Sequence, residues 1–388
     1  GQLFDTRERR RIVGDYVQTP IDIFTQRTFP DTVNLSSSNF DTHGFTVHPI
    51  VMLKPPDLRD FPAYTPYRCM LPKSLDGILV IGLGLSAHRD AMPFLRMQPD
   101  IQNQGYAMGI AASMAAKENK RTRDIDIKQL QQHLVKIGNL PESVLTDEDS
   151  FPVSKERIAE AVKNVVFDLK EKQSGGDVRL PSQEFDPIAV ILAQPQDSLP
   201  LLKEAYRTSE NQTDKLIYAQ IMGMMGSAEG GDALIDAVET HAWDDRGSLY
   251  GRRQSPLDDL IIALGRTRDP RGVQVILEKL EQLDSQSAFS HHRAAAIALE
   301  TLGDPAAAKP LADLLDKPGM TGYAATDIET AKRQTRSQSL RELILARALY
   351  RCGDYQGKGE AILKQYEKDL RGHQSRHAHA VLKEPHHR

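Results

Sequence analysis

The pattern of apolar positions divides the chain into two parts of different character. Up to about residue 75, short apolar stretches such as Phe45–Leu53 alternate with turn-forming Pro, Thr and Asp, which predicts short strands and loops. Beyond about residue 150, apolar residues recur at helical spacing between Gly and Asp-Pro turns. We therefore predict an α/β or α+β N-terminal part followed by an all-α region.

Between these parts the sequence predicts one buried strand and two helices. The run 77–82 follows a turn and is continuously apolar between its glycines, which is typical of a strand covered on both faces. Residues Asn103–Lys117 are rich in Gly and Ala and predict a helix that a sheet or a ligand can approach closely. Residues Asp124–Leu134 have amphipathic spacing and predict a short helix that ends before Gly138.

A repeated pattern runs through the helical region: an apolar helix, a glycine, a short turn and a second helix. Its marker glycines are Gly226, Gly265, Gly303 and Gly353, at spacings of 39, 38 and 50 residues. We expect each glycine to follow a helix in the left-handed conformation. Each helix pair buries only half of its apolar surface, so the pairs must stack into a solenoid. The pattern resembles HEAT-like repeats over residues 186–372.

Composition and charge exclude several classes of protein. The chain has 49 basic and 53 acidic residues, a net charge of −4, which excludes a generally basic nucleic-acid-binding protein. No apolar run approaches the ~18 residues of a membrane-spanning helix. Two cysteines, Cys69 and Cys352, exclude a disulfide framework and a multi-cysteine metal site, and they do not indicate a compartment. Because the chain begins with Gly1, we expect it to be a processed or partial protein.

One short motif suggests dinucleotide binding but lacks its context. Residues Gly82–Ala87 fit G-x-G-x-x-A after the predicted strand. The fingerprint also needs a helix that starts at once and an acidic residue at the end of the next strand. Pro93 interrupts such a helix, and Asp100 follows Gln98-Pro99, which is no strand. The motif alone therefore does not assign a dinucleotide site.

A wider series of motifs is more specific. It resembles the C-terminal portion of the FAD-dependent oxidoreductase family that includes xanthan lyase-like flavoproteins, and the resemblance covers about residues 4–140. The segments that carry it, in order, are Arg7–Tyr16, Tyr67–Lys73, Leu75–Gly82, Ser86–His88, Arg96–Pro99, Gly105–Gly109 and Asp124–Asp126.

The resemblance implies an FAD site built from this part of the chain. The strand ending at Gly82 would be the last of a nucleotide-binding sheet. The helix starting near Asn103 would point its free N–H groups at the flavin and stabilise negative charge there. Six residues would contact the cofactor: Gly82, Ser86, Ala87, Asn103, Gln104 and Gly105.

Two histidines are the candidate catalytic residues. The resemblance places His88 beside the flavin and His43 near the substrate. The alternative for His88 is a solvated loop residue, and for His43 a turn histidine satisfied by Asp41.

The sequence also departs from the family pattern. Leu83 and Gly84 stand where the family often has Arg, and the glycine-rich motif that holds the FAD pyrophosphate would lie upstream of Gly1. We therefore expect the chain by itself to bind FAD weakly and to be inactive.

Other polar residues favour structural roles. The cluster at Arg7 and Arg9–Arg11 includes Glu8 and predicts a solvated or ion-paired helix face. We expect Arg68 to pair with an acid inside the protein, and Cys69 not to be a redox thiol because no CxxC partner is present. His373 and His377 are at metal-ligand spacing, but they lie in a polar tail without acidic or cysteine ligands.

These interpretations give four regions and two possible functions. The regions are an oxidoreductase-like part at 1–140, a linker and connecting helix at 141–185, the solenoid at 186–372 and a polar tail at 373–388. The favoured function is flavin-mediated hydride transfer on a substrate that the sequence does not identify. The alternative is a non-catalytic protein that binds a protein partner through its solenoid.

Overall fold

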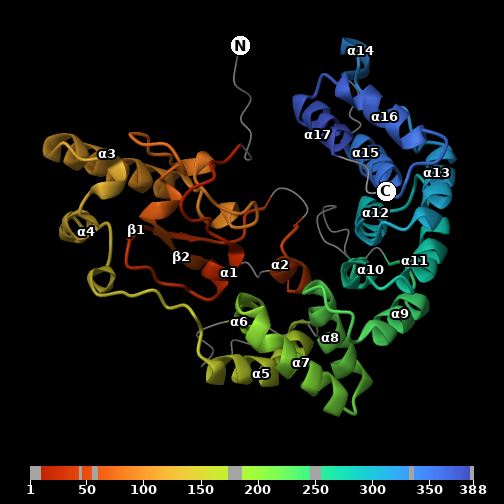
Figure 1. The fold of residues 1–388 in the computed structure, drawn as a ribbon, viewed down its shortest axis with the longest axis horizontal. Coiled ribbons are helices and arrows are strands. Elements are labelled where there is room, and N and C mark those ends of the chain that lie inside the picture. Colours follow the sequence, from red (N-terminus) through yellow and green to blue (C-terminus); the bar gives the residue numbers. More distant parts are fainter. Residues whose placement is uncertain are drawn as a thin grey trace. The chain divides into compact units, whose positions relative to one another are not determined.

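The computed structural model describes residues 10–42, 46–54, 60–173, 186–244, 255–331 and 336–384 (Figure 1). Its contacts divide the chain into two compact units, 1–201 and 202–388. No helix within the described ranges has the length and apolar character that crossing a membrane requires.

The first unit contains a small antiparallel sheet. Strand β1 (Thr32–Ser38) pairs with β2 (Phe61–Pro66), with Leu35 opposite Tyr64 and Ser38 opposite Phe61. In the described part of this unit, β1 and β2 are the strands of the sheet. The N-terminal part thus contains short strands, as predicted. The apolar stretch Phe45–Leu53, however, does not form one in its described residues: residues 49–53 form helix α2 (Pro49–Leu53), because Pro49 favours the first helical position.

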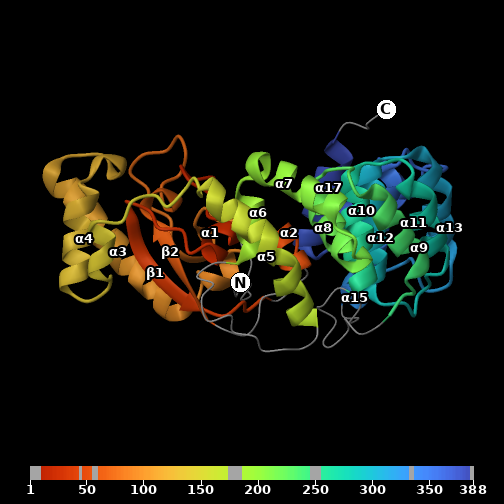
Figure 2. The ribbon, with the colours of Figure 1, turned by 90° about the horizontal axis from the view of Figure 1, so that it is seen from below.

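Helices surround this sheet. Helix α3 packs against β1, and α4 contacts both β1 and α3, as the orange and yellow helices of Figure 2 show. Helix α6 packs against α5, α1 and α2. The bounds are α1 (Pro20–Phe24), α2 (Pro49–Leu53), α3 (Gln98–Glu118), α4 (Ile127–Lys136), α5 (Lys155–Gln173) and α6 (Pro187–Ala193).

The predicted buried strand at 77–82 does not form. Ile78 is 48% exposed, and the 3-10 turn Gly82–Gly84 follows an irregular stretch. Leu79 and Ile81 do pack against the core, and the Val80 N–H donates to the Met70 carbonyl. A strand needs a continuous hydrogen-bonded neighbour, and β1 and β2 pair with each other elsewhere in the unit. One face of the apolar run is therefore covered by the core, but in the described residues the run forms no hydrogen-bond ladder with a neighbouring strand.

The two predicted helices are present with shifted bounds. The small-residue helix is α3, which begins at Gln98 and not near Asn103, because Pro99 favours a helix start and Asp100 supplies an acid in the first turn. The amphipathic helix is α4, which begins at Ile127 after the Asp126 side chain accepts from the Gln129 N–H.

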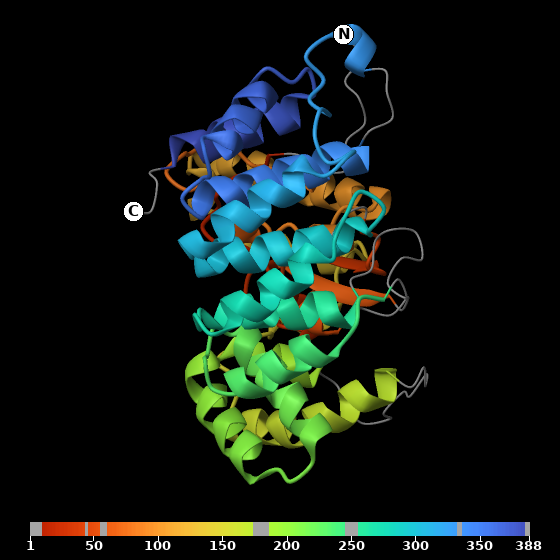
Figure 3. The ribbon, with the colours of Figure 1, turned by 90° about the vertical axis from the view of Figure 1, so that its right-hand side faces the viewer.

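The second unit is a series of packed helices. The inner helices α8, α10, α12 and α15 contact one another in turn, and α8, α10 and α15 each pack against the helix that follows them. Figure 3 shows this succession from green to blue. The helices are α8 (Gln212–Met224), α9 (Gly231–Thr240), α10 (Pro256–Thr267), α11 (Gly272–Glu281), α12 (Phe289–Leu302), α13 (Ala308–Asp316), α14 (Ile328–Ala331), α15 (Arg336–Arg351), α16 (Lys358–Glu367) and α17 (Gly372–Lys383). Helix α7 (Pro195–Thr208) spans the boundary between the units.

The prediction of a mixed N-terminal part followed by packed helices is confirmed. Gly226, Gly303 and Gly353 have positive φ, as a helix-ending glycine should. Gly265 differs because it lies inside α10, where a Cβ would stand 2.4 Å from the Ala298 Cα of α12. This glycine permits close helix packing and does not end the helix.

The stretch expected as a polar tail forms α17. Ala378 and Val381 are buried, and the helix packs against α16. His377 lies 3.3 Å from Arg347, and His379 lies 2.8 Å from Glu367, so both imidazoles have protein partners. No group of three potential metal ligands is found in the described ranges.

Candidate functional site

Two segments far apart in the sequence run side by side at the candidate site. Backbone hydrogen bonds join Ile12 to Gly84 at 2.9 Å, Gln18 to Ser86 at 3.1 Å, and His88 to Gln18 at 2.7 Å. The N-terminal motif and the Ser-Ala-x-His motif are therefore neighbours, although the sequence separates them by about 70 residues.

Ser86 and Gly14 lie at the centre of this junction. The Gly14 N–H donates to the Ser86 Oγ at 2.9 Å, and Ser86 is fully buried. A Cβ at Gly14 would come within 2.7 Å of the Ser86 Cβ. The hydroxyl that was predicted to contact a cofactor thus has a backbone partner, and Ala87 beside it is also buried.

The Gln104 side chain connects α3 to the loop at Gly82 and to Leu95. Its Oε1 accepts the Gly82 N–H at 2.8 Å, and its Nε2 donates to the Leu95 carbonyl at 3.0 Å. Gln104 is fully buried, and Gly82 has a φ of 62°. The structure therefore brings the predicted residues Gly82 and Gln104 together, and Gln104 fixes the loop against α3.

The predicted helix start at Asn103 is wrong. Asn103 lies in the second turn of α3, where backbone N–H groups bond within the helix. The first turn carries Asp100, which is 7% exposed. Burial raises the pKa of Asp100 to about 6, although the nearby backbone N–H groups of Met97 and Ser37 oppose this shift. The N-terminal end of α3, where the helix dipole is positive, therefore already carries the carboxyl group of Asp100.

His88 lies in a compact polar cluster that the sequence does not predict. Its ring meets the ring of His48 edge-on, with centroids 5.2 Å apart. Asp90, which is 1% exposed, accepts the N–H groups of Val47 and His48 at 2.7 Å each. The spacing of His88 and Asp90 was visible in the sequence, but the approach of His48 depends on the tertiary fold.

His88 is half-buried, and its surroundings disfavour the charged imidazolium. Burial lowers the pKa of His88, Asp90 opposes the shift, and Arg11 and Arg89 lower it further. The prediction of a solvated loop residue therefore does not describe this ring. His43 lies outside the described residues.

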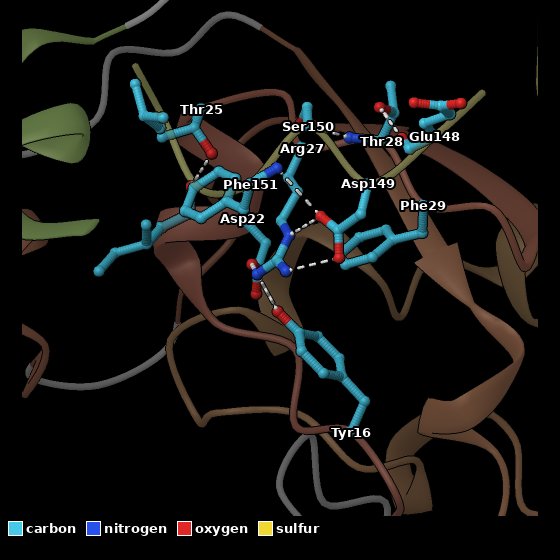
Figure 4. A network of polar contacts seen from close by, with 12 residues as sticks. Tyr16, Asp22, Thr25, Arg27, Thr28, Phe29, Glu148, Asp149, Ser150 and Phe151 are labelled. Carbon is cyan, nitrogen blue, oxygen red and sulfur yellow. Dashed lines mark hydrogen bonds and ion pairs between the residues drawn. The ribbon is translucent and has the colours of Figure 1, made fainter. Parts of the chain in front are cut away.

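Arg27 organises a further polar network that the sequence analysis missed. Figure 4 shows its guanidinium between Tyr16 and Asp22 on one side and Asp149 on the other. Arg27 Nε and Nη2 each bond to the Asp149 carboxylate at 2.9 Å, and Nη1 bonds to the Tyr16 hydroxyl at 2.8 Å. The Phe151 ring lies 4.3 Å from the guanidinium carbon. This network ties residues 148–151 to the core of the first unit.

The remaining polar residues have structural partners. Arg68 pairs with Asp31 at 3.0 Å, which confirms the prediction of an internal acidic partner. Cys69 is fully buried, and burial raises the pKa of its thiol, as expected for a cysteine without a redox role. Arg10 and Arg11 lie in a segment without regular secondary structure, so the predicted helix face does not form at these two residues.

The residues that the resemblance assigns to FAD fit the cofactor in part. The Gly82 N–H, the Ser86 hydroxyl and the Gln104 amide form hydrogen bonds within the protein. These residues therefore stabilise the loop of the proposed site and do not offer these bonds to a cofactor. Asn103 is exposed, and a Cβ at Gly105 would meet the Ile81 Cδ1 at an ordinary 3.5 Å. A side chain at Gly105 would therefore contact Ile81 of the same unit.

The segment Gly82–Ala87 does not fit the phosphate groups of FAD. Residues Gly82–Gly84 form a 3-10 turn, and the next α-helix begins only at Gln98. A phosphate-binding loop needs glycines directly before a helix N-terminus. The Gly82–Ala87 segment is therefore not a pyrophosphate cradle, in agreement with the weak motif in the sequence.

Comparison with known families supports the resemblance. No curated protein matches the chain. Residues 292–317, which form most of α12 and α13, match the PBS lyase HEAT-like repeat, and residues 2–134 match the FAD dependent oxidoreductase family. The N-terminal third of this chain therefore matches a region of the FAD dependent oxidoreductase family, and it is followed by packed helices that include a match to the PBS lyase HEAT-like repeat.

Proposed function

We propose that the first unit forms the flavin-facing part of an oxidoreductase that transfers a hydride between FAD and a small-molecule substrate. The family match over residues 2–134 carries this proposal. FAD supplies the redox chemistry when it is bound, because its isoalloxazine ring can accept a hydride from a substrate carbon.

The residues of this chain have three tasks in the proposed site. The turn of α3 that carries the exposed Asn103 and the partly buried Gly105 offers its surface to the ring. Gln104 fixes the distance between α3 and the loop that starts at Gly82. His88 contacts the substrate from the loop that Ser86 and Gly14 anchor.

A titration of FAD against the chain and against the longest natural gene product tests this proposal. Quenching of flavin fluorescence reports binding. We expect tight binding by the longer form and weak binding by this chain. We also expect Gly105→Val to weaken binding about tenfold or more, because the added Cβ would stand 3.5 Å from the Ile81 Cδ1 and the two methyl groups beyond it would push the loop at Ile81 away from α3, beside the proposed position of the ring.

Gln132→Val, at an exposed position of α4, is the matched control and should leave FAD affinity unchanged. The proposal is wrong if neither form binds FAD. It is also wrong in its placement of the ring if Gly105→Val and the control bind equally well.

A second function is favoured by the helical region. The HEAT-like match at residues 292–317 and the stacked inner helices motivate the proposal that this region binds a protein partner. The two functions are compatible. Failure of both chain forms to bind FAD would leave partner binding as the role of the protein.

A further inference from the structure

Residues 319–325, here called the strap, lie against the start of α15 and the turn between α16 and α17. The strap has no regular secondary structure, and its Met320 and Ala325 side chains are buried. Elsewhere in the unit, α11 reaches α12 through residues 282–288 alone, whereas residues 317–335 separate α13 from α15. The stacking of the helices therefore does not by itself require a segment of this length.

Two buried carboxylates accept the backbone N–H groups of the strap. The Gly322 and Tyr323 N–H groups donate to the two oxygens of Glu342 at 3.0 and 2.8 Å. The Ala325 N–H donates to Asp369 Oδ2 at 2.8 Å. Glu342 and Asp369 are 1% and 5% exposed, so both carboxylates need such donors.

Two guanidinium groups bind the carbonyl oxygens of the strap. Arg341 Nη2 donates to the Gly319 carbonyl and Arg371 Nη2 to the Tyr323 carbonyl, each at 2.7 Å. The buried Arg341 Nε has no hydrogen-bond partner among the described residues, so the strap leaves one donor unused. The four side chains that bind the strap, here called the strap site, are Arg341, Glu342, Asp369 and Arg371.

The helices themselves hold the strap site in position. The Tyr366 hydroxyl donates to Glu342 Oε2 at 2.8 Å. Arg371 donates to the Asp369 carboxylate through Nε at 2.9 Å and through Nη2 at 2.6 Å, and its Nη1 donates to Ser339 Oγ at 3.1 Å. These contacts do not involve the strap, so the site is organised before a ligand enters it.

We propose that the strap site binds the backbone of an extended segment of a partner protein, and that the strap occupies the site when no partner is bound. This inference deepens the second proposed function and rests on it. Carboxylates accept N–H groups and guanidinium groups donate to carbonyl oxygens, and a peptide backbone offers both along its length. Because the bonds described above all end on backbone atoms of the strap, a segment of different sequence can replace it.

Hydrogen exchange in the full chain tests whether the strap can leave its site. We expect the Tyr323 and Ala325 amides to have protection factors at least about tenfold lower than the Leu345 amide inside α15, since the strap should open without unfolding of the helices. Equal protection at these three amides would show that the strap opens only with the whole unit, and would overturn the proposal.

A fluorescein-labelled peptide with the sequence of residues 318–327 is the probe for binding, measured by fluorescence anisotropy. Wild type should bind it at least about tenfold more weakly than Gly322→Val, because the tethered strap competes for the site at high effective concentration. Gly322 has a φ of 93°, which valine disfavours, and no atom lies within 4 Å of its Cβ position. The substitution therefore strains the strap without touching the strap site.

A second opening variant and a matched control accompany Gly322→Val. Met320→Ser removes a fully buried side chain of the strap and should also permit peptide binding. Gly357→Val introduces similar backbone strain outside the strap, at a φ of 70° with no atom within 4 Å, and should bind the peptide as weakly as wild type.

Methylated peptides test the backbone contacts without changing the protein. A methyl group on the nitrogen of Tyr323 removes the donor to Glu342 and should weaken binding to Gly322→Val at least about tenfold. A methyl group on the nitrogen of Ala324, which makes none of the bonds described above, should change affinity by less than about threefold.

No peptide binding by either opened variant, or equal affinity of the two methylated peptides, would overturn the proposal. Such a failure would leave the second proposed function in place, because partner binding by another face of the helices does not need the strap site. None of these measurements involves FAD, so their outcome is also independent of the oxidoreductase function.

Discussion

The backbone N–H of Gly14 donates to the hydroxyl of Ser86 at 2.9 Å, and the two residues are so close that a side chain at Gly14 would displace Ser86. This contact joins two motifs that the family resemblance treats as separate. It explains why one motif contains a glycine and the other a small hydroxyl residue. The pair positions the loop that carries His88.

Gly14→Ala should destabilise the first unit by about 1–3 kcal/mol. The added Cβ would lie 2.7 Å from the Ser86 Cβ and 3.1 Å from the carbonyl oxygens of Arg68 and Leu71, which cannot easily move. Urea unfolding monitored by circular dichroism measures the change. Gly109→Ala is the matched control, because no atom lies within 4 Å of that Cβ position, and it should stabilise α3 by about 0.5–1 kcal/mol. Equal effects of both substitutions would contradict the close contact.

Gln104→Leu should cost about 1–3 kcal/mol, because it removes the acceptor of the buried Gly82 N–H and leaves that donor unsatisfied. The leucine has similar volume, so the loss of the hydrogen bond dominates. Hydrogen exchange at the Gly82 amide should become faster. Gln102→Leu, at an exposed position of the same helix, should leave this exchange unchanged. An unaltered exchange rate in Gln104→Leu would show that Gln104 does not hold the loop.

Arg27→Lys should destabilise the first unit by about 1–3 kcal/mol. Lysine cannot make the two parallel bonds to Asp149 together with the bond to Tyr16, and Arg27 is only 16% exposed. Limited proteolysis should cut the segment near residues 148–151 faster in this variant. Arg121→Lys, whose exposed side chain pairs with Asp124, should change stability by less than about 0.5 kcal/mol. Similar losses in both variants would argue against a special role for Arg27.

Asp100 should give the stability of the first unit a distinct pH dependence. The folded pKa of about 6 lies above the ordinary 3.8, so the folded protein binds more protons than the unfolded chain between these values. Stability should therefore fall by about 1–3 kcal/mol as pH rises from about 4 to about 6, and then level off.

Asp100→Asn should flatten this part of the profile, since it removes the titrating group. The measurement is the free energy of urea unfolding at intervals from about pH 4 to about pH 7. Asp124→Asn, on an exposed carboxylate with a lowered pKa, should keep the downward slope. Parallel profiles of wild type and Asp100→Asn would refute the assignment.

The sequence by itself determined the division of the chain into a mixed part and a helical part. Helical periodicity and its turn residues are local properties, so they predicted the helix pairs and three of the four helix-ending glycines. The ordered motifs also identified the family region, which the comparison over residues 2–134 bears out. Each of these signals is contained in a few consecutive residues or in their order.

Tertiary structure decided which local patterns formed and what the site residues contact. The apolar run at 77–82 did not become a strand because a strand depends on neighbours that local sequence does not specify. Gly265 proved to be a packing residue because only the approach of Ala298 makes its missing side chain necessary. The contacts of Gly14 with Ser86, of Gln104 with Gly82 and of His48 with His88 join distant segments. No periodicity along the chain encodes such contacts, because they arise from how the segments pack in three dimensions.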